Sequence, residues 1–198
     1  DALKDVIQGE ILDDPETLVK YSHDASIYEI KPAVVIYPKS AEDIKNLVKF
    51  INSHQDMNLS LTVRAAGTCM SGGSLNDSII LDVTQHMNQL LEVGDDYAVT
   101  QPGIYYRDFE KRTMAEKKLL FPAYTSSREI CAVGGMIGNN AAGEKSLTFG
   151  STKNWIDELK VILRDGEEHI FKALTVEELD AKKAEDNLEG EIYRRIWQ

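Results

Sequence analysis

The sequence predicts an α+β fold in which a small parallel βαβ part is followed by a mixed or antiparallel part. Between residues 33 and 83, short apolar runs enclose one amphipathic helical pattern, which is the order of a right-handed crossover between parallel strands. After residue 86, the clearest strand signal is a hairpin, as in an antiparallel sheet. We therefore expect an N-terminal helical region (residues 1–30), a first subdomain (31–85) and a second subdomain with C-terminal helices (86–198).

The elements of the first part follow from local patterns. An Asp-Pro pair at residues 14–15 begins a helix, because proline suits a first helical turn. Residues 33–37 are an apolar run between two prolines, which predicts a buried strand. Ser40 begins a helix with one apolar stripe, since it opens a capping-box-like sequence. Two further strands are predicted at residues 59–63 and 79–83.

The second part shows weaker signals. Residues 97–100 predict a strand that ends in a Pro-Gly turn, and residues 106–119 predict a moderately amphipathic helix. A hairpin is expected over residues 159–171, around an Asp-Gly turn. A capped helix then begins at Thr175, and Gly190 separates it from a last helix. The chain ends inside this helical pattern, which predicts a piece of a longer protein.

The composition excludes several classes of protein. Of the 198 residues, 42% are hydrophobic and 28% are charged, which is typical of a folded globular domain. The formal net charge of −11 makes nucleic acid an unexpected partner, because phosphate binding needs a basic surface. No apolar run reaches the ~20 residues of a transmembrane helix. Two distant cysteines, and no apolar leader at the first residue, favour a reducing, cytoplasmic location.

The segment Arg64–Ser74 is the first candidate binding site. It leaves the end of a predicted parallel strand, where open α/β folds place their ligands, and it consists almost wholly of small residues. Small side chains let successive backbone N–H groups of a turn approach an anion closely, so the segment predicts a phosphate-binding loop. A flexible surface loop is the alternative.

The second candidate site is formed by Pro122–Ser127 and Val133–Gly143. These residues are small and carry little charge before Glu144. Such a chain is expected where the backbone packs against a flat ligand or against another backbone. Tight helix–sheet packing around Gly134-Gly135 explains the composition equally well.

No other motif predicts chemistry. A Gly-x-Gly-x-x-Gly fingerprint is absent, and Glu144 breaks the spacing of a P-loop near residues 138–146. Cys69 is more simply a tolerated small side chain than a reactive thiol, and Cys131 is expected to be a small buried hydrophobe. The histidines lack metal-ligand spacing and are expected at the surface or in turns: His23, His54, His86 and His169. We therefore name no catalytic and no metal-binding residue.

Taken in order, these segments resemble the FAD-binding (PCMH-type) domain of the vanillyl-alcohol-oxidase superfamily. The resemblance is greatest to the FAD-linked dehydrogenases of D-lactate, glycolate and 2-hydroxyglutarate, and it runs from about Tyr21 to the end of the chain. It implies a two-subdomain fold with FAD laid across both subdomains. The matching segments are residues 21–25, 38–44, 64–74, 101–103, 134–143, 149–152 and 159–166.

The resemblance also implies which residues bind FAD. Those that would hold the pyrophosphate are Ala65, Ala66, Gly67, Thr68, Cys69, Met70, Ser71, Gly73 and Ser74. Those that would lie beside the flavin are Pro122, Ser126 and Ser127. Those that would line the isoalloxazine–ribityl face or the adenosine are Gly134, Gly135, Gly138, Asn139, Ala142 and Gly143. Some relatives attach FAD covalently through a histidine in the first loop, but Thr68 stands there, so we expect non-covalent FAD.

In this family, a hydride passes from the carbinol carbon of a 2-hydroxy acid to flavin N5. The family's substrate cap and its contacts to an electron acceptor lie C-terminal to the matching region, and some relatives also carry an iron–sulfur domain or subunit. The 198 residues alone should therefore be inactive, as part of a protein in the cytoplasm or at the periphery of the inner membrane.

Two alternatives stay open: a flavin domain like that of UDP-N-acetylenolpyruvylglucosamine reductase, and a non-catalytic scaffold. The segment Asn139–Gly143 fits the hydroxy acid group better than the reductase. The retention of both glycine-rich segments weighs against the scaffold, because a scaffold released from FAD would not need them.

Overall fold

The structure is a computed structural model that describes residues 2–197. The chain forms two compact units, which meet along the sequence at residues 155 and 156, and each unit is described by itself. The predicted subdomain boundary at residues 85 and 86 lies inside the first unit and stays a prediction. Among residues 2–197, no helix has the length and apolarity needed to cross a membrane.

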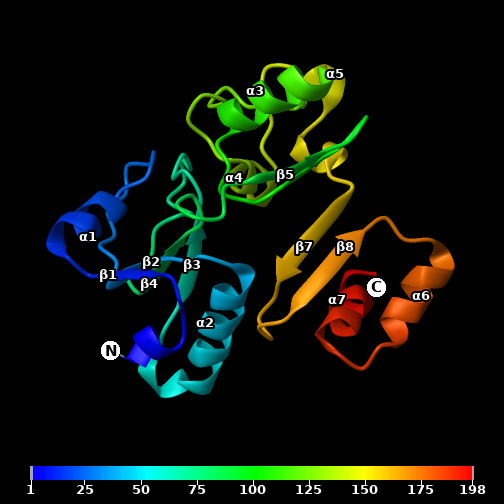
Figure 1. The fold of residues 1–198 in the computed structure, drawn as a ribbon. Coiled ribbons are helices and arrows are strands. Elements are labelled where there is room, and N and C mark those ends of the chain that lie inside the picture. Colours follow the sequence, from blue (N-terminus) through cyan, green and yellow to red (C-terminus); the bar gives the residue numbers. More distant parts are fainter. Residues whose placement is uncertain (1, 198) are drawn as a thin grey trace. The chain divides into compact units, whose positions relative to one another are not determined.

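A four-stranded sheet forms the centre of the first part of this unit (Figure 1). The strands lie in the order β1-β2-β4-β3, and β2, β4 and β3 run parallel to one another. The predicted parallel arrangement is therefore confirmed. All four residues of β4 are buried, and both faces of the strand are packed: Ile79 and Leu81 belong to one core cluster and Ile80 to another. The strands are β1 (Glu10–Leu12), β2 (Val34–Tyr37), β3 (Leu61–Arg64) and β4 (Ile79–Asp82).

The prediction of a helical N-terminal region is wrong between Glu10 and Leu12. The region does contain a 3-10 turn, η1 (Ala2–Asp5), and helix α1 (Pro15–Tyr21), but the residues between them form edge strand β1, antiparallel to β2. A Cβ on Gly9 would lie 2.3 Å from the carbonyl oxygen of Tyr37, so the two backbones approach closely there. Pairing with a distant strand decided this element, and three residues are too few to show a period.

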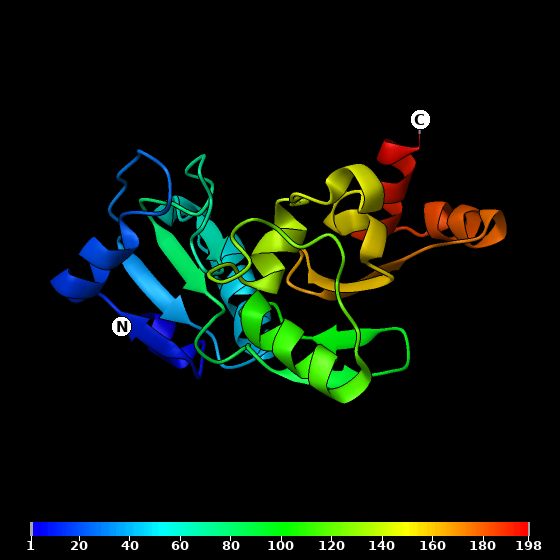
Figure 2. The same ribbon diagram turned by 90° about the horizontal axis from the view of Figure 1, so that it is seen from above.

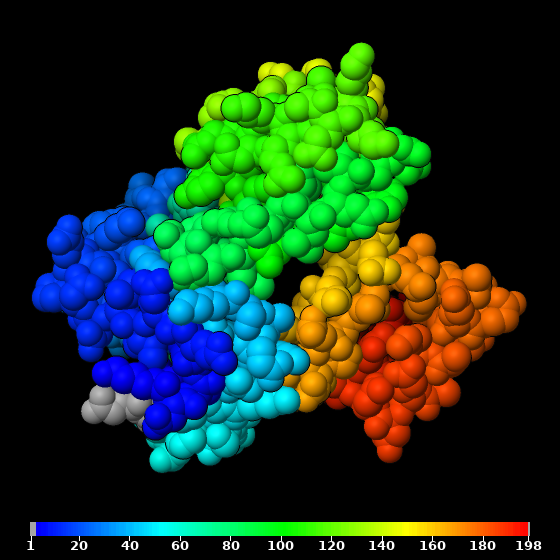
Figure 3. Space-filling view, viewed as in Figure 1, coloured from blue at the N-terminus to red at the C-terminus, as the bar shows by residue number. Residues whose placement is uncertain are grey.

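Helix α2 (Ala41–Ser53) begins at Ser40 as predicted, and its apolar stripe packs on the sheet, with Leu47 fully buried. The carboxylate of Asp43 accepts hydrogen bonds of 2.8 Å from the N–H groups of Lys39 and Gln8. It thereby fastens the chain around η1 to the start of α2, and these segments cover the sheet side by side (Figure 3). A 3-10 turn, η2 (Gln55–Met57), follows α2.

The rest of the first unit is built on an antiparallel hairpin and a helix. Strand β5 (Leu90–Val93), which the sequence patterns did not predict, pairs with β6 (Ala98–Thr100). Helix α3 (Tyr106–Lys117) packs against this hairpin (Figure 2), and Tyr106 is fully buried between them. The helix ends two residues earlier than predicted because Lys118 takes a left-handed conformation, with φ 57°. Three short elements follow: α4 (Val133–Gly138), α5 (Ser146–Phe149) and η3 (Thr152–Trp155).

The second unit consists of a hairpin and two helices. Strands β7 (Glu158–Ile162) and β8 (Glu168–Lys172) confirm the predicted hairpin, and α6 (Val176–Ala184) begins with a complete capping box at Thr175. Gly190 does not separate the helices as predicted: it lies inside α7 (Leu188–Ile196). Asn187 caps that helix instead, and a Cβ on Gly190 would lie 2.1 Å from the carbonyl oxygen of Glu185, so glycine is required by close packing.

Candidate functional site

The two glycine-rich segments meet in the folded chain. The first follows β3, and the second begins in α4. A Cβ on Gly135 would contact the Cβ of Ala65 at 3.4 Å, which is ordinary van der Waals distance. The structure therefore brings together, at the carboxyl end of a parallel strand, two segments whose contacting residues, Ala65 and Gly135, lie 70 positions apart in the sequence. This edge is where open α/β folds bind ligands.

The predicted site residues occupy three stretches of the first unit. Ala65–Ser74 is the loop after β3, and Pro122, Ser126 and Ser127 lie in the loop after α3. Gly134, Gly135 and Gly138 are in α4, Asn139 is its C-cap, and Ala142 and Gly143 follow it. The contact between Ala65 and Gly135 joins the first stretch to the third, and a contact between Tyr124 and Gly143 joins the second to the third.

The loop Arg64–Ser74 presents backbone N–H groups. Gly67 and Gly72 have φ angles of 67° and 77°, so the loop takes two left-handed turns that other residues adopt only with strain. None of the N–H groups from Ala65 to Met70 donates a hydrogen bond to another described residue. Unbonded N–H groups in a tight turn of mostly small residues are able to bind an anion such as a pyrophosphate.

Cys69 lies in this loop with its sulfur 3.2 Å from the hydroxyl of Ser71. The hydroxyl and N–H of Ser71 lower the pKa of the thiol, and the N–H of Gly73 adds to the effect. Cys131 is buried, with 3% of its surface exposed, within the core around α3. The prediction for Cys131 is therefore confirmed, whereas Cys69 has a lowered pKa and is only partly covered.

A buried polar network supports the start of the loop. The hydroxyl of Tyr21 donates to Asp82 at 2.5 Å, and Asp82 also accepts from the N–H and hydroxyl of Thr84, at 2.7 and 2.6 Å. Burial, and then the Asp82 carboxylate, raise the pKa of Tyr21 far above its usual value, so the phenol stays a donor. The guanidinium of Arg64 lies 5.1 Å from the centre of the Tyr21 ring. The sequence patterns assigned Asp82 and Thr84 no role, although an aspartate that ends a buried apolar strand is a signal.

Packing explains some glycines of the second segment but not all. The N–H of Gly134 donates to the carbonyl oxygen of Pro102 at 2.7 Å, and a Cβ there would lie 2.7 Å from the same oxygen. A Cβ on Gly143 would lie 2.0 Å from the carbonyl oxygen of Tyr124. These two positions need glycine for close backbone packing. Gly138 has no atom within 4 Å of a Cβ built on it, so the fold does not require glycine there.

The loop Pro122–Ser127 is held by Tyr124, which is 6% exposed. Two cations lie over its ring: the guanidinium of Arg128, 4.5 Å from the ring centre, and the ammonium of Lys145, at 5.3 Å. Its hydroxyl donates to Glu144 at 2.9 Å. The charged residues that follow Gly143 therefore fasten this loop to the second glycine-rich segment.

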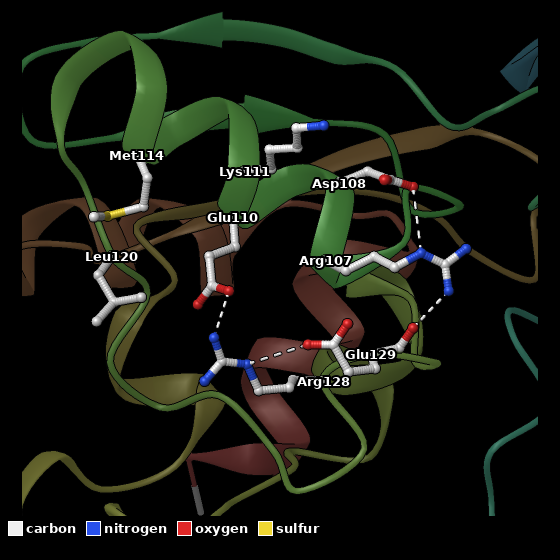
Figure 4. A pocket seen from close by; sticks show the side chains of 8 residues that line it. All are labelled: Arg107, Asp108, Glu110, Lys111, Met114, Leu120, Arg128 and Glu129. Atoms are coloured by element: carbon white, nitrogen blue, oxygen red, sulfur yellow. Dashed lines mark hydrogen bonds and ion pairs between the residues drawn. The ribbon is translucent and has the colours of Figure 1, made fainter.

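A shallow, open pocket of about 620 Å³ lies between α3 and the loop that follows it (Figure 4). Its two arginines pair with neighbouring carboxylates: Arg128 binds Glu110 at 2.6 Å, and Arg107 lies 3.9 Å from Asp108 and also donates to the carbonyl oxygen of Glu129 at 2.6 Å. None of the predicted FAD-binding residues lines it. The pocket is thus separate from the glycine-rich site.

His169 differs from its prediction as a surface or turn histidine. It lies in β8, and its side chain is 11% exposed. Its ring nitrogens lie 2.9 Å from Asp165 and 3.2 Å from Glu189, whose other oxygen pairs with Lys182 at 2.9 Å. This cluster connects the hairpin to α7 within the second unit.

Comparison with known proteins identifies the family. A family model described as "FAD binding domain" matches residues 32–172, and the chain belongs to this family. The resemblance seen in the sequence, the fold class and the assignment of FAD as cofactor are thereby confirmed.

Three curated relatives have related names. The chain is 30% identical over 184 residues to D-2-hydroxyglutarate dehydrogenase of Haemophilus influenzae, covering 92% of this chain and 18% of that protein. It is 30% identical over 151 residues to glycolate oxidase subunit GlcD of Bacillus subtilis (74% and 31%), and 29% identical over 136 residues to D-lactate dehydrogenase of Archaeoglobus fulgidus (67% and 29%). The chain therefore spans 18% to 31% of the length of these relatives.

Solved structures share the fold. 6-Hydroxy-D-nicotine oxidase from Arthrobacter nicotinovorans matches with a TM-score of 0.70 at 21% identity, over 84% of this chain and 36% of that one. Chitooligosaccharide oxidase matches with a TM-score of 0.72 at 14% identity, over 87% and 37%. At these identities the likeness concerns the fold alone.

Proposed function

We propose that the chain is the FAD-binding part of a flavin-dependent enzyme that oxidises a 2-hydroxy acid of the D-lactate, glycolate or 2-hydroxyglutarate class. The names of the curated relatives support the substrate class. The observation that carries the proposal is the row of unbonded N–H groups from Ala65 to Met70, beside Gly135. A dinucleotide needs such a site for its pyrophosphate and a small-residue surface for its flat rings.

In this proposal, the loop after β3 holds the pyrophosphate through its N–H groups, without a covalent bond at Thr68. Gly135, Gly138 and Asn139, with Ala142 and Gly143, present the backbone surface against which the flavin or adenosine rests. Pro122, Ser126 and Ser127 contribute from the loop that Tyr124 fastens to Gly143. Bound FAD would supply the two-electron redox chemistry. The protein's part is to bind and orient it and to exclude water from one side.

We assign three tasks to a part of the protein outside these 198 residues: binding the hydroxy acid, moving its proton and contacting the electron acceptor. This follows from the 18% to 31% of the relatives' length that the chain spans. We accordingly propose that the chain alone does not turn over substrate. A cytoplasmic or membrane-peripheral location and an iron–sulfur domain or subunit remain predictions from the sequence.

The visible absorption spectrum of the purified, desalted chain, with and without added FAD, tests the binding part of this proposal. We expect a flavin band that elutes with the protein. If neither this chain nor the full-length protein retains a flavin band, FAD binding by this site is contradicted. Reduction of the flavin band in the full-length protein by D-lactate, glycolate or D-2-hydroxyglutarate, with no response to their L enantiomers where these exist, tests the substrate class.

A further inference from the structure

The segment Tyr21–Tyr28, which begins at the last residue of α1 and leads towards β2, contacts both ends of the glycine-rich loop. At the start of the loop, Nη1 of Arg64 donates to the carbonyl oxygen of Tyr21 at 3.5 Å, and the guanidinium stacks on the tyrosine ring. At the end of the loop, the hydroxyl of Ser74 donates to Oδ2 of Asp24 at 2.9 Å. The two ends of the loop are thus tied to one short stretch of chain.

The same segment contacts the middle of the loop at its two left-handed glycines. The N–H of Ala25 donates to the carbonyl oxygen of Gly67 at 3.2 Å. The ring of Tyr28 lies beside Gly72, where a Cβ would meet its Cδ2 at 2.9 Å. Gly67 and Gly72 are the positions at which the loop backbone turns. The segment therefore contacts the loop at both of its left-handed turns.

The carboxylate of Asp24 is the centre of these contacts. One oxygen accepts from the N–H of Ser26 at 2.8 Å, and the other accepts from the hydroxyl of Ser74, so both are used within the protein. Partial burial works to raise the pKa of Asp24, but the hydrogen bonds from Ser26 and Ser74 and the charge of Arg64 hold it below its ordinary value. The side chain is ionised at neutral pH and accepts strong, charge-assisted hydrogen bonds.

We propose that Asp24 is a positioning residue for FAD, which holds the loop Arg64–Ser74 in its binding conformation through Ser74 and the segment Tyr21–Tyr28. This inference rests on the proposed function, in which that loop holds the pyrophosphate. A loop of small residues with two left-handed glycines has much conformational freedom to lose when it binds. The segment Tyr21–Tyr28 orders the loop before binding. This segment precedes the matched family region, which begins at residue 32.

The test compares the Kd for FAD, measured by quenching of flavin fluorescence, among variants of the protein. Asp24→Ala and Ser74→Ala should each raise the Kd about tenfold or more, the size expected for a lost charged hydrogen bond. The double variant should bind no more weakly than about the weaker single variant, because both remove the same contact. Ser74→Thr keeps the hydroxyl and should bind FAD with a Kd within about threefold of wild type. If position 74 only filled space, the presence of a hydroxyl there would not affect the Kd.

Two further variants distinguish a wrong role for Asp24 from a wrong location of the FAD site. Asp13→Ala removes an exposed carboxylate with no such contacts and should bind like wild type. Gly67→Val disrupts the left-handed turn itself and should abolish binding. If Gly67→Val loses FAD while Asp24→Ala and Ser74→Ala bind like wild type, the loop assignment stands and the role of Asp24 is overturned. If Gly67→Val also binds like wild type, the proposed site is wrong as well. If Asp24→Ala fails to fold, the comparison of Ser74→Ala with Ser74→Thr decides.

Discussion

The hydroxyl of Tyr21 donates a 2.5 Å hydrogen bond to the carboxylate of Asp82, 61 residues further along the chain. Both residues are buried, with 2% and 4% of their surfaces exposed. The bond fastens the end of α1 to the end of β4, next to the strand from which the glycine-rich loop departs. A contact between residues far apart in the sequence therefore supports the start of the loop that is proposed to bind FAD.

Tyr21→Phe should lower the free energy of unfolding by about 1–3 kcal/mol, since it leaves a buried carboxylate with one donor fewer. Urea unfolding followed by circular dichroism measures this change. Tyr97→Phe is the matched control, because Tyr97 also donates at 2.5 Å, to Glu92, but at an exposed position. It should leave stability nearly unchanged. Equal effects of the two substitutions would mean that burial of the Tyr21–Asp82 bond does not matter.

Gly138→Ala should affect FAD binding but not lower the stability of the fold. Nothing lies within 4 Å of a Cβ at this position, and alanine favours a helix over glycine by about 0.5–1 kcal/mol. The apoprotein should therefore melt at the same or a higher temperature, while the Kd for FAD rises. Gly134→Ala should instead lower the melting temperature, since its Cβ would meet Pro102. A Gly138→Ala variant that binds FAD like wild type would remove Gly138 from the site.

The two cysteines should react differently with iodoacetamide. Cys69 is partly covered and has a lowered pKa, so it should be alkylated at neutral pH, whereas Cys131, at 3% exposure, should not react in the folded protein. Added FAD should slow the reaction of Cys69, because the pyrophosphate would occupy the same loop. Peptide mass spectrometry reads both sites in one sample. Reaction of Cys69 at the same rate with saturating FAD would contradict the assignment of this loop.

The stability of the second unit should depend on pH through His169. Partial burial works to lower the pKa of His169, but hydrogen bonds to Glu189 and Asp165 raise it above 6.5. A raised pKa in the folded state means that the ion pairs contribute fully below about pH 6.5 and are lost as pH rises through the raised value. Lys182 and Glu185 also face this cluster.

We expect the contribution of His169 to be about 1 kcal/mol or less, as for other partly exposed ion pairs. His169→Gln should remove that part of the pH dependence, and unfolding curves at pH 6 and pH 8.5 measure it. Titration of the His169 ring by NMR checks the direction of the pKa shift directly. A titration midpoint below 6.5 would mean that burial outweighs the two carboxylates and that the pH dependence has the opposite sign.

Elements set by local patterns were predicted well. Ser40 and Thr175 begin their helices because a hydroxyl caps backbone N–H groups within the same turn, and the hairpin around residues 163–167 follows from alternation and an Asp-Gly turn. Strand β1 was mispredicted because it depends on pairing with a distant strand, next to Gly9. The role of Gly190 was mispredicted because it depends on close packing of α7 against the end of α6, at Glu185 and Lys182. β5 was missed because only its first residue is buried, which leaves no clear alternation.

By itself, the sequence determined the fold class and the family, and it pointed to the two glycine-rich segments proposed to bind FAD, because small residues in a given order are visible without coordinates. Only the tertiary structure decided that Ala65 meets Gly135, and that Gly134 and Gly143 serve packing while Gly138 does not. The same holds for the contacts of Asp24 with Ser74 and of Tyr21 with Arg64. The physical reason is that these contacts join residues far apart in the chain. Their partners are set by how strands and loops pack, and no local propensity records that.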